Sequence, residues 1–435
     1  MHSLNTLFYI DIPDNPEVIV YSEIKCNRLI YVLDFIFNRI AQKKYVLTND
    51  IVFFQQSDKV KINYSENLIR DVINVFPLSL IKDKGIDRSY SPNFKVQKEG
   101  FYFEDIFSKV FYYLSRYEEA QKNFFPDKHQ RFEISVINHK EFYSSPLVDV
   151  AVHQFFQYIQ RYYNTFQIPY FYEVIYTFDL DNILAFRGKS IWRSAGALLK
   201  HISKKEWLLL KKRINVLFNN IKDPLEDIYD FIEILSEKHP VIFFVLCRSN
   251  TAYDRAASIN DEETKRILNH LKGFAHIGVH PSYYSYNNEE LIRKEKSILE
   301  SVIQQRVIAS RQHYLRIDIS ITPKLLINQG FEYDFTMGFA SAAGWRAGTS
   351  YPFYYYDFDT ESATSLLLVP FVFMDGAYFN YQQVPIDNAL NQIRVIEKQV
   401  QDTGGYFIPL FHEMTLSSLF FPAMAEQWKM YLQEI

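Results

Sequence analysis

Cysteine is scarce in this chain, which has two in 435 residues, Cys26 and Cys247. They lie far apart and match no zinc-type spacing, and two cysteines make a disulfide framework implausible. This usage is typical of a protein from a reducing compartment. Glycine is also sparse, at 13 residues. There is no internal repeat and no Gly/Ser-rich or Pro-rich linker, which excludes collagen-like and low-complexity classes.

Long apolar runs are absent as well. The longest, Val241–Cys247 and Leu366–Met374, fall far short of the ~18–20 residues that span a bilayer. The first 14 residues lack a basic start, and Asp11 interrupts their apolar residues. They therefore do not fit a signal peptide, and we expect a cytoplasmic protein.

The chain has little net charge, because 47 Lys and Arg face 51 Asp and Glu, giving −4. This balance offers no whole-chain attraction to nucleic acid, and no nucleic-acid partner is expected. Residues 187–222 differ: ten Lys and Arg against the single acid Glu206 give +9, which leaves −13 for the remainder. Apolar residues, including Trp192 and Trp207, alternate with these charges. The pattern fits a helical lid with solvated charges or an amphipathic segment that makes peripheral contact with the inner face of a membrane. Nucleic-acid binding is a third alternative, which no recognised binding motif accompanies.

Apolar residues are abundant: 48% of the chain is hydrophobic and 17% is aromatic. Such a chain buries a large core, and its length favours two domains. Residues 1–165 combine one short extended run with amphipathic helix candidates. They predict a smaller α/β domain without an evident chemical site. Its elements are expected at Glu17–Tyr21, Asn27–Ile40, Phe103–Ala120 and Pro146–Tyr163.

From residue 170 onward, strand-like and helix-like segments alternate. The strands are expected at Tyr172–Phe178, Val241–Leu246, Phe274–Val279 and Tyr406–Phe411, and the helices at Leu225–Lys238, Asp261–Leu271, Glu289–Gln304 and Pro385–Thr403. This alternation predicts βα units and a parallel sheet or barrel over residues 170–435. In such folds the chemistry lies at the carboxyl ends of the strands.

Three of these strands are followed at once by Asp or His. Asp179 and Asp181 point the same way from the first strand, a spacing that suits one metal ligand and one general base. His280 follows the third strand. His276 lies about 13 Å away along an extended strand, too far to share a metal with it. His412 ends the fourth strand, where it suits a general acid. Taken singly, each residue also has an ordinary structural explanation as a cap or a packed side chain.

The segment Ser310–Tyr314 adds two further candidates. Arg311 could orient a carboxylate. His313 fits either a metal ligand or a hydrogen-bonded loop residue. The residue types alone do not decide between these alternatives.

The order of these motifs resembles the polysaccharide deacetylase family of carbohydrate esterases, also called the NodB homology domain. The resemblance covers roughly residues 170–415. The matching segments are Thr177–Asp181 with one inserted residue, the strand Val241–Leu246, Ile277–His280, Arg311–Tyr314, Tyr333–Thr336 and Leu410–His412.

The resemblance implies a distorted (β/α) TIM-like barrel that uses a divalent metal, zinc being the favoured ion. Carried over, Asp179 is the general base, Asp181 and His280 are metal ligands, and His412 is the general acid. Arg311 holds the base in place, with Asp334 nearby.

The second histidine of the family motif falls on Tyr284, a poor zinc ligand because its pKa is ~10. His313 could supply the missing ligand; otherwise water does, or the site is altered. A rival register pairs His276 with His280.

The implied function is metal-dependent hydrolytic N-deacetylation of an amino sugar in a cytoplasmic glycan or glycolipid precursor. Two alternatives remain: hydrolysis of another C–N bond on the same scaffold, and a non-catalytic glycan- or lipid-binding protein with a degenerate site. Leu114–Glu119 also resembles a segment of N-terminal domains that precede some bacterial deacetylase modules. We expect its charges to form solvated ion pairs at a helix end.

Overall fold

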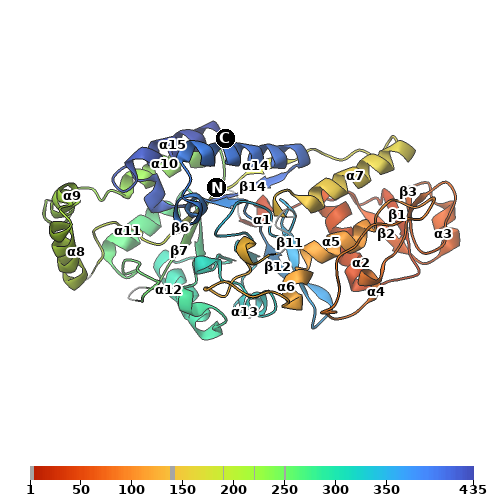
Figure 1. Ribbon diagram of the computed structural model, residues 1–435, viewed down its shortest axis with the longest axis horizontal. Coiled ribbons are helices and arrows are strands. Elements are labelled where there is room, and N and C mark those ends of the chain that lie inside the picture. Colours follow the sequence, from red (N-terminus) through yellow and green to blue (C-terminus); the bar gives the residue numbers. More distant parts are fainter. Residues whose placement is uncertain (1–3, 138–142, 190, 220, 249–250) are drawn as a thin grey trace.

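The computed structural model describes residues 4–137, 143–189, 191–219, 221–248 and 251–435. The molecule is elongated (Figure 1). A small α/β domain, which contains β1 to β4, lies at one end, and a larger α/β unit forms the middle. The helical hairpin α8–α9 projects from the other end.

The first domain is built on a parallel four-stranded sheet of order β2-β1-β3-β4. Its strands are β1 (Val18–Tyr21), β2 (Tyr45–Thr48), β3 (Val60–Tyr64) and β4 (Ile73–Val75). Its helices are α2 (Asn27–Leu33), η1 (Asp34–Ile40), α3 (Ile51–Gln56), α4 (Ser79–Lys82), α5 (Ile106–Leu114), α6 (Tyr117–Gln121), η2 (Ile134–Val136) and α7 (Leu147–Tyr162). The expected α/β arrangement of these residues is confirmed, and their division from the rest of the chain as a separate domain stays a prediction.

Two of the expected helices are interrupted. The segment Asn27–Ile40 begins as the α-helix α2 but continues as the π-helix η1, in which Ala41 N–H bonds to the Ile36 carbonyl at 3.1 Å. The segment Phe103–Ala120 is divided between α5 and α6 because Arg116 adopts a left-handed conformation, with φ 56°. Apolar periodicity indicated a helical face in both segments but not these changes of backbone geometry.

The larger unit contains a nine-stranded sheet of order β11-β12-β10-β9-β8-β7-β6-β15-β13. Its strands are β6 (Tyr176–Leu180), β7 (Val241–Val245), β8 (His276–Val279), β9 (Ala309–Ser310), β10 (Tyr333–Asp334), β11 (Phe353–Asp357), β12 (Ser362–Leu368), β13 (Phe373–Met374) and β15 (Pro409–His412). All neighbours are parallel except the β11–β12 pair. Strands β11 and β13 form opposite edges of this sheet, so a mixed α/β fold is confirmed and a closed barrel stays a prediction.

Two of the expected strands each divide in two. Tyr172–Phe178 becomes β5 (Tyr172–Val174) and β6, and Tyr406–Phe411 becomes β14 (Gly405–Phe407) and β15. Strands β5 and β14 pair with each other as a separate small sheet.

Helices and short turns follow the strands and enclose the sheet (Figure 1). They are α8 (Ile191–Ser203), α9 (Trp207–Phe218), α10 (Glu226–Ser236), α11 (Glu262–Leu271), η4 (Tyr283–Ser285), α12 (Glu289–Ile303), η5 (His313–Leu315), α13 (Thr322–Asn328), η6 (Ala377–Gln382), α14 (Ile386–Thr403), η7 (Glu413–Leu416) and α15 (Pro422–Glu434). The amino-terminal helix α1 (Leu4–Leu7) contributes Leu4, Leu7 and the following Phe8 to a core cluster with strand residues such as Ile242 and Ile408. None of the helices described is long and apolar enough to cross a bilayer.

A buried ion network joins the first domain to the larger unit. Glu119 of α6 accepts hydrogen bonds from Arg116 at 2.8 Å and from Arg346 at 2.8 and 2.9 Å. The side chains of all three are at most 3% exposed. The expectation of solvated ion pairs in Leu114–Glu119 is therefore wrong for Arg116 and Glu119, because the larger unit covers them.

Candidate metal centre

The polar residues predicted from the sequence meet at the carboxyl ends of neighbouring parallel strands. Asp179 lies in β6 and Asp181 directly follows it, while His280 follows β8. The segment after β9 supplies Arg311 and His313. On β15, His412 pairs in register with Asp179, so these two side chains leave adjacent strands side by side.

Asp181, His280 and His313 form a group that can hold a metal ion. One donor atom from each lies within 4.8 Å of the others. The Nε2 atoms of both histidines are 3.6 Å from Asp181 Oδ1. Two imidazole nitrogens and one carboxylate oxygen are donors that suit zinc in an open, catalytic type of site.

A hydrogen bond at Nδ1 of each histidine determines which ring nitrogen faces the centre. His280 Nδ1 donates to the Arg311 carbonyl. His313 Nδ1 lies 2.8 Å from Asp254 Oδ1, to which it donates. With Nδ1 engaged in these bonds, Nε2 is the ring nitrogen of each histidine that faces Asp181. Such outer hydrogen bonds are usual for metal-bound histidines.

The electrostatics also fit a cation at this place. Asp181 Oδ1 is buried and has no hydrogen-bond partner among the described residues. Burial disfavours charge on both His313 and Asp181. Nevertheless, Asp181 and Asp254 raise the pKa of His313 to about 9. The neighbouring histidines hold the pKa of Asp181 well below its usual range. The group therefore has an uncompensated acceptor that a cation would satisfy.

Tyr284 and His276 lie outside this group. The side chain of Tyr284 is 46% exposed, and His276 begins β8, at the opposite end of the strand from His280. The extended backbone of β8 contradicts the rival register in which His276 and His280 share a metal. Among the described residues, His313 rather than Tyr284 lies with Asp181 and His280.

Asp179 is paired with Arg311 beside this group. Arg311 Nη1 donates to Asp179 Oδ1 at 2.9 Å, and both side chains are nearly inaccessible. The other carboxylate oxygen, Oδ2, lies 3.5 Å from His280 Nε2. Arg311 also stacks on the Phe244 ring at 4.4 Å. Gly278 makes room for that ring, because a Cβ there would lie 2.7 Å from it.

Asp334 is placed behind Arg311. It is fully buried, and it accepts hydrogen bonds from Ser310 at 2.7 Å and from Thr336 at 3.0 Å. Thr336 Oγ1 in turn accepts from Gln312 N–H. These bonds link Asp334 to the Ser310 side chain and, through Thr336, to the Gln312 backbone, the two neighbours of Arg311.

His412 has a carboxylate partner that the sequence analysis missed. His412 Nδ1 lies 2.7 Å from Asp375 Oδ1, and its backbone N–H donates to Asp375 Oδ2 at 2.8 Å. Burial works against a charged ring, but Asp375 raises the pKa of His412 well above its ordinary value. Asp375 directly follows the short strand β13. Asp375 could therefore have been found from the sequence, because, like Asp179, it is an acid at the end of an apolar strand.

Asp254 and Glu413 were also missed. Asp254 lies between β7 and α11 with no local motif to mark it. Glu413 accepts hydrogen bonds from the backbone N–H groups of Asp181 and Asn182, at 3.2 and 3.0 Å. Burial and the charge of Asp181 raise the pKa of Glu413 to about 8. Glu413 thereby fixes the loop that carries Asp181.

The first domain reaches the rim of the centre. His129 Nδ1 lies 3.2 Å from the Tyr283 hydroxyl, and Arg131 donates to the Tyr314 carbonyl at 3.0 Å. Tyr314 adopts a left-handed conformation, with φ 59°, beside His313. The Tyr253 and Tyr283 rings stack nearby at 3.9 Å. The centre is therefore bordered by tyrosines that a first-domain segment holds in place.

Replacing either ligand histidine should weaken zinc binding. We expect His280→Ala and His313→Ala to lower the affinity by more than about 100-fold, beyond the 10–100-fold typical of losing an outer-shell partner. Competition with a fluorescent zinc chelator measures the affinity. His276→Ala is the matched histidine control and should bind like the wild type. Full zinc occupancy in His313→Ala would remove that residue from the site.

Comparisons with known proteins found one family model and several solved structures of low similarity. A family of unknown function (DUF7033) matches residues 18–164, and no curated protein matches. Among solved structures, a protein from Mycobacterium smegmatis assigned as a polysaccharide deacetylase shares 16% identity with a TM-score of 0.39, over 61% of this chain and 84% of that one. A polysaccharide deacetylase from Bacillus cereus shares 13% with a TM-score of 0.27, over 60% and 88%. A mutant CE4 family pseudoenzyme with restored activity shares 12% with a TM-score of 0.25, over 60% and 63%.

Proposed function

We propose that this chain is a metal-dependent hydrolase that removes the acetyl group from an amino sugar of a glycan or glycolipid precursor. One observation carries the proposal. The Asp181–His280–His313 group is flanked by a buried Asp179–Arg311 pair and by a His412–Asp375 pair. A ligand set, a carboxylate base and a histidine acid are the groups that hydrolysis of an amide requires.

Asp181, His280 and His313 would hold the cation. When bound, it supplies Lewis acidity and brings the pKa of water near 7. The outer bonds to Asp254 and the Arg311 carbonyl keep both imidazoles in the ligand orientation. The Glu413 carboxylate accepts a hydrogen bond from the backbone N–H of Asp181 and so fixes that residue's position.

Asp179 acts as the base that takes the proton from the attacking water. Its Oδ1 is occupied by Arg311, so Oδ2, on the side of His280, is the atom that accepts. Arg311 is held by three donor contacts, to Asp179, Thr177 and the Phe335 carbonyl. The base is thus fixed in orientation before substrate arrives, which avoids reorganisation during the reaction.

His412 acts as the acid that protonates the leaving amine. Asp375 accepts its Nδ1 proton, so the second proton is carried on Nε2. Burial opposes a charged ring, but Asp375 raises the pKa of this imidazole, which favours the protonated form that an acid needs. Deacetylation needs that proton because a free amide anion is a very poor leaving group.

Acetate release tests the function. Zinc-loaded protein, incubated with the N-acetylglucosamine tetramer, should release acetate and a free amine in equal amounts, and metal-free protein should not. Release of ammonia or another amine from a different C–N substrate, without acetate, would favour the first alternative. Bound zinc and saturable glycan binding without any turnover would favour the second, a binding protein.

We also propose that the α8–α9 hairpin brings the enzyme to an anionic membrane surface. Its apolar residues face outward: Trp192 is 87% exposed, Phe218 74%, Leu208 72% and Trp207 60%. On α8, Trp192 and Leu199 lie seven residues apart and share one face of the helix. Globular domains rarely leave such large side chains exposed together.

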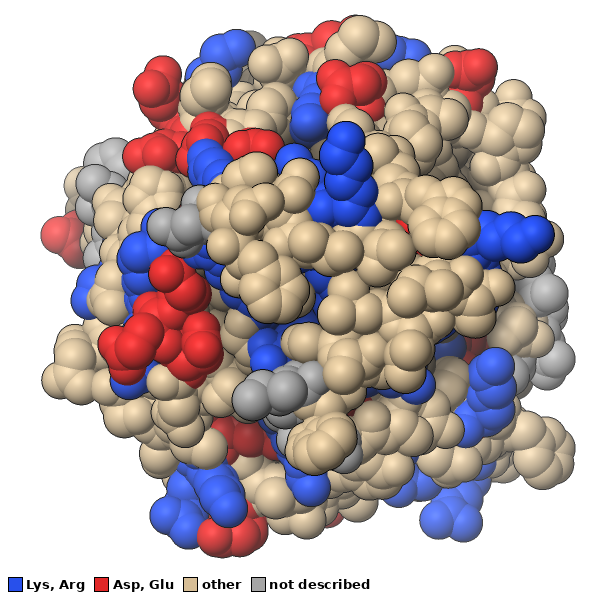
Figure 2. Space-filling model, turned by 90° about the vertical axis from the view of Figure 1, so that its left-hand side faces the viewer, with Lys and Arg blue, Asp and Glu red and all other residues tan. Residues whose placement is uncertain are grey.

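Basic side chains accompany this apolar surface. Lys200, Lys204, Lys205 and Lys211 are exposed, and Figure 2 shows Lys and Arg side chains scattered among uncharged ones at this end of the molecule. Each such charge near an anionic membrane contributes about 1 kcal/mol. Trp, Leu and Lys together are the composition of helices that lie in the bilayer interface.

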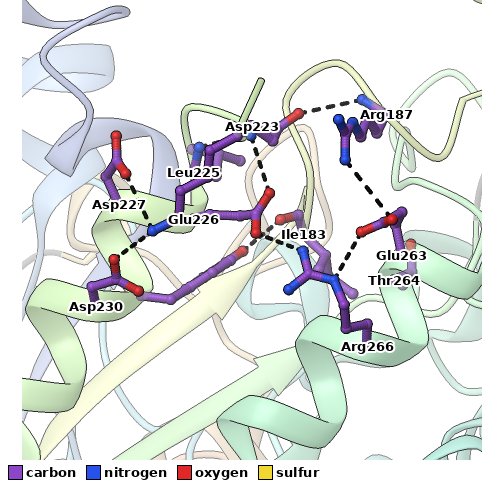
Figure 3. Close-up of polar contacts among 12 residues, drawn as sticks. Ile183, Arg187, Asp223, Leu225, Glu226, Asp227, Asp230, Glu263, Thr264 and Arg266 are labelled. Carbon is purple, nitrogen blue, oxygen red and sulfur yellow. Dashed lines mark hydrogen bonds and ion pairs between the residues drawn. The ribbon is translucent and has the colours of Figure 1, made fainter. Parts of the chain in front are cut away.

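The base of the hairpin is firmly attached to the larger unit (Figure 3). Asp223 accepts hydrogen bonds from the backbone N–H groups of Ala185 and Phe186 at 2.9 Å. Arg187 pairs with Glu263 of α11. Because the hairpin follows Asp181 in the chain, membrane contact through it would hold the centre close to a lipid-linked substrate.

Sedimentation with vesicles of 25% anionic and 75% neutral phospholipid tests this contact. We expect binding at 50 mM salt that weakens at 500 mM. We expect the double variant Trp192→Ser/Trp207→Ser to bind more than about 10-fold less, since each large apolar side chain contributes about 1.5–3 kcal/mol on burial. The matched control is Phe125→Ser/Tyr170→Ser, whose side chains are exposed elsewhere. Absence of binding at low salt would contradict the proposal.

A further inference from the structure

A cavity lies between the first domain and the larger unit, apart from the metal centre. Its volume is about 680 Å³, within the range of small-molecule sites. The segment around Phe8 and Tyr9, the π-helix η1 and strands β10 to β12 line it. Tyr333 of β10 faces this cavity, whereas the next residue, Asp334, supports the Arg311 segment.

Two polar atoms that line the cavity lack partners. Arg39 Nη1 and Asn38 Oδ1 are buried and have no hydrogen-bond partner among the described residues. Both residues belong to η1, and π-helical turns occur frequently at functional sites. A buried charged donor without an acceptor is costly to the folded protein. The pair therefore offers one cationic donor and one acceptor to an incoming molecule.

The acidic residues of the cavity already have partners. Asp34 accepts hydrogen bonds from Asn38 Nδ2 and from the Tyr45 hydroxyl, both at 2.9 Å. Glu332 pairs with Arg306 at 3.0 Å. The partners of Asp34 are neutral and Asp34 itself is exposed, whereas Arg39 Nη1 is a buried charged donor without an acceptor among the described residues, which favours an acidic ligand group at that atom.

Aromatic rings form much of the remaining wall. Phe8, Tyr9, Tyr31, Tyr333 and Tyr354 all line the cavity. The Arg39 guanidinium lies 5.7 Å from the centre of the Tyr354 ring. Aromatic walls can pack against a ring of the ligand, and the Arg39 guanidinium can pair with an acidic group on that ligand.

We propose that this cavity binds a small organic anion whose carboxylate or phosphate pairs with Arg39 and whose ring packs between the tyrosines. The cavity is separate from the metal centre, so ligand binding to it can be measured without any hydrolytic activity. A polymer does not fit its volume, so the ligand is of monosaccharide or single-ring size.

Isothermal titration of metal-free protein with three named probes tests the proposal. Phenyl phosphate and benzoate carry the two acidic groups on the same ring, and benzyl alcohol is the neutral comparison. At least one anion should bind with a Kd below 1 mM, and benzyl alcohol should bind at least 10-fold more weakly. The better anion then identifies the acidic group that the site prefers.

Variants assign the binding to this cavity. Arg39→Gln should weaken it by about 10–100-fold, the effect of losing a hydrogen bond to a charged group. Arg293→Gln, an exposed arginine on α12, is the matched control and should bind like the wild type. Ser365→Trp alters an exposed residue of the wall and should block access even if Arg39→Gln folds poorly. Failure of both anions to bind, equal affinity for benzyl alcohol, or unchanged binding in Arg39→Gln and Ser365→Trp would each overturn the proposal.

Discussion

Asp179→Asn should lower kcat for acetate release by about 10²–10⁴-fold, the contribution of a positioned general base. The amide has the shape of the carboxylate but cannot take up the proton of the attacking water. It also leaves the buried Arg311 guanidinium without its counter-charge. Steady-state kinetics on the N-acetylglucosamine tetramer, with zinc-loaded protein, measures the loss.

Zinc content distinguishes the role of Asp179 from that of its neighbour. Asp179→Asn should retain zinc, because the ligand group consists of Asp181, His280 and His313. Asp181→Asn should lose both zinc and activity. Asp387→Asn, an exposed aspartate on α14, is the matched control and should match the wild type in both measurements. Wild-type kcat in zinc-loaded Asp179→Asn would refute its role as the base, and loss of zinc would make it a ligand instead.

Glu119→Gln should lower the free energy of unfolding by about 3–5 kcal/mol, the range measured when one partner of a buried ion pair is removed. The substitution leaves Arg116 and Arg346 buried without a carboxylate. Urea unfolding followed by tryptophan fluorescence reports the change, because Trp345 is buried beside Arg346. Glu290→Gln, which breaks an exposed pair with Arg293, is the matched control and should leave the free energy of unfolding close to that of the wild type.

The effect of Glu119→Gln should depend on pH. Burial disfavours the charged carboxylate, but Arg346 and Arg116 hold the pKa of Glu119 below its ordinary value. A lowered folded-state pKa contributes stability that is full above the unfolded value of about 4.3 and is lost as the pH falls through the folded value. The difference between wild type and variant should therefore shrink in acid. A difference below 1 kcal/mol at pH 7 would show that the network contributes little.

Local sequence pattern was sufficient to predict most of the strands that carry the centre. Val241–Leu246 became β7, and the acids after Phe178 and the histidines after β8 and within β15 lie at strand ends as expected. A fully apolar run marks a buried strand, and the polar residue that follows marks the end of that strand to within a few residues. The π-helix η1 escaped prediction because apolar spacing is similar in α- and π-helical turns, and the break at Arg116 escaped it because no Gly or Pro marks that position.

The partners of the candidate residues could not be predicted in this way. His313 and Asp254 are 59 residues apart, and His412 and Asp375 are 37 apart. Glu119 and Arg346 are separated by 227 residues. No periodicity within a segment encodes contacts of this range, since they depend on how strands are ordered in the sheet.

The sequence by itself determined the residue types and their positions along the strands: two carboxylates after Phe178, a histidine after β8, an Arg and a His after β9, and a histidine ending β15. It also determined the charge of the 187–222 segment. Only the tertiary structure decided that His313 rather than Tyr284 completes the group with Asp181 and His280. The burial of Glu119 against Arg346 and the exposure of the tryptophans of α8 and α9 also follow from the tertiary structure alone. The physical reason is that strand order and domain packing bring distant side chains together and exclude water from some of them.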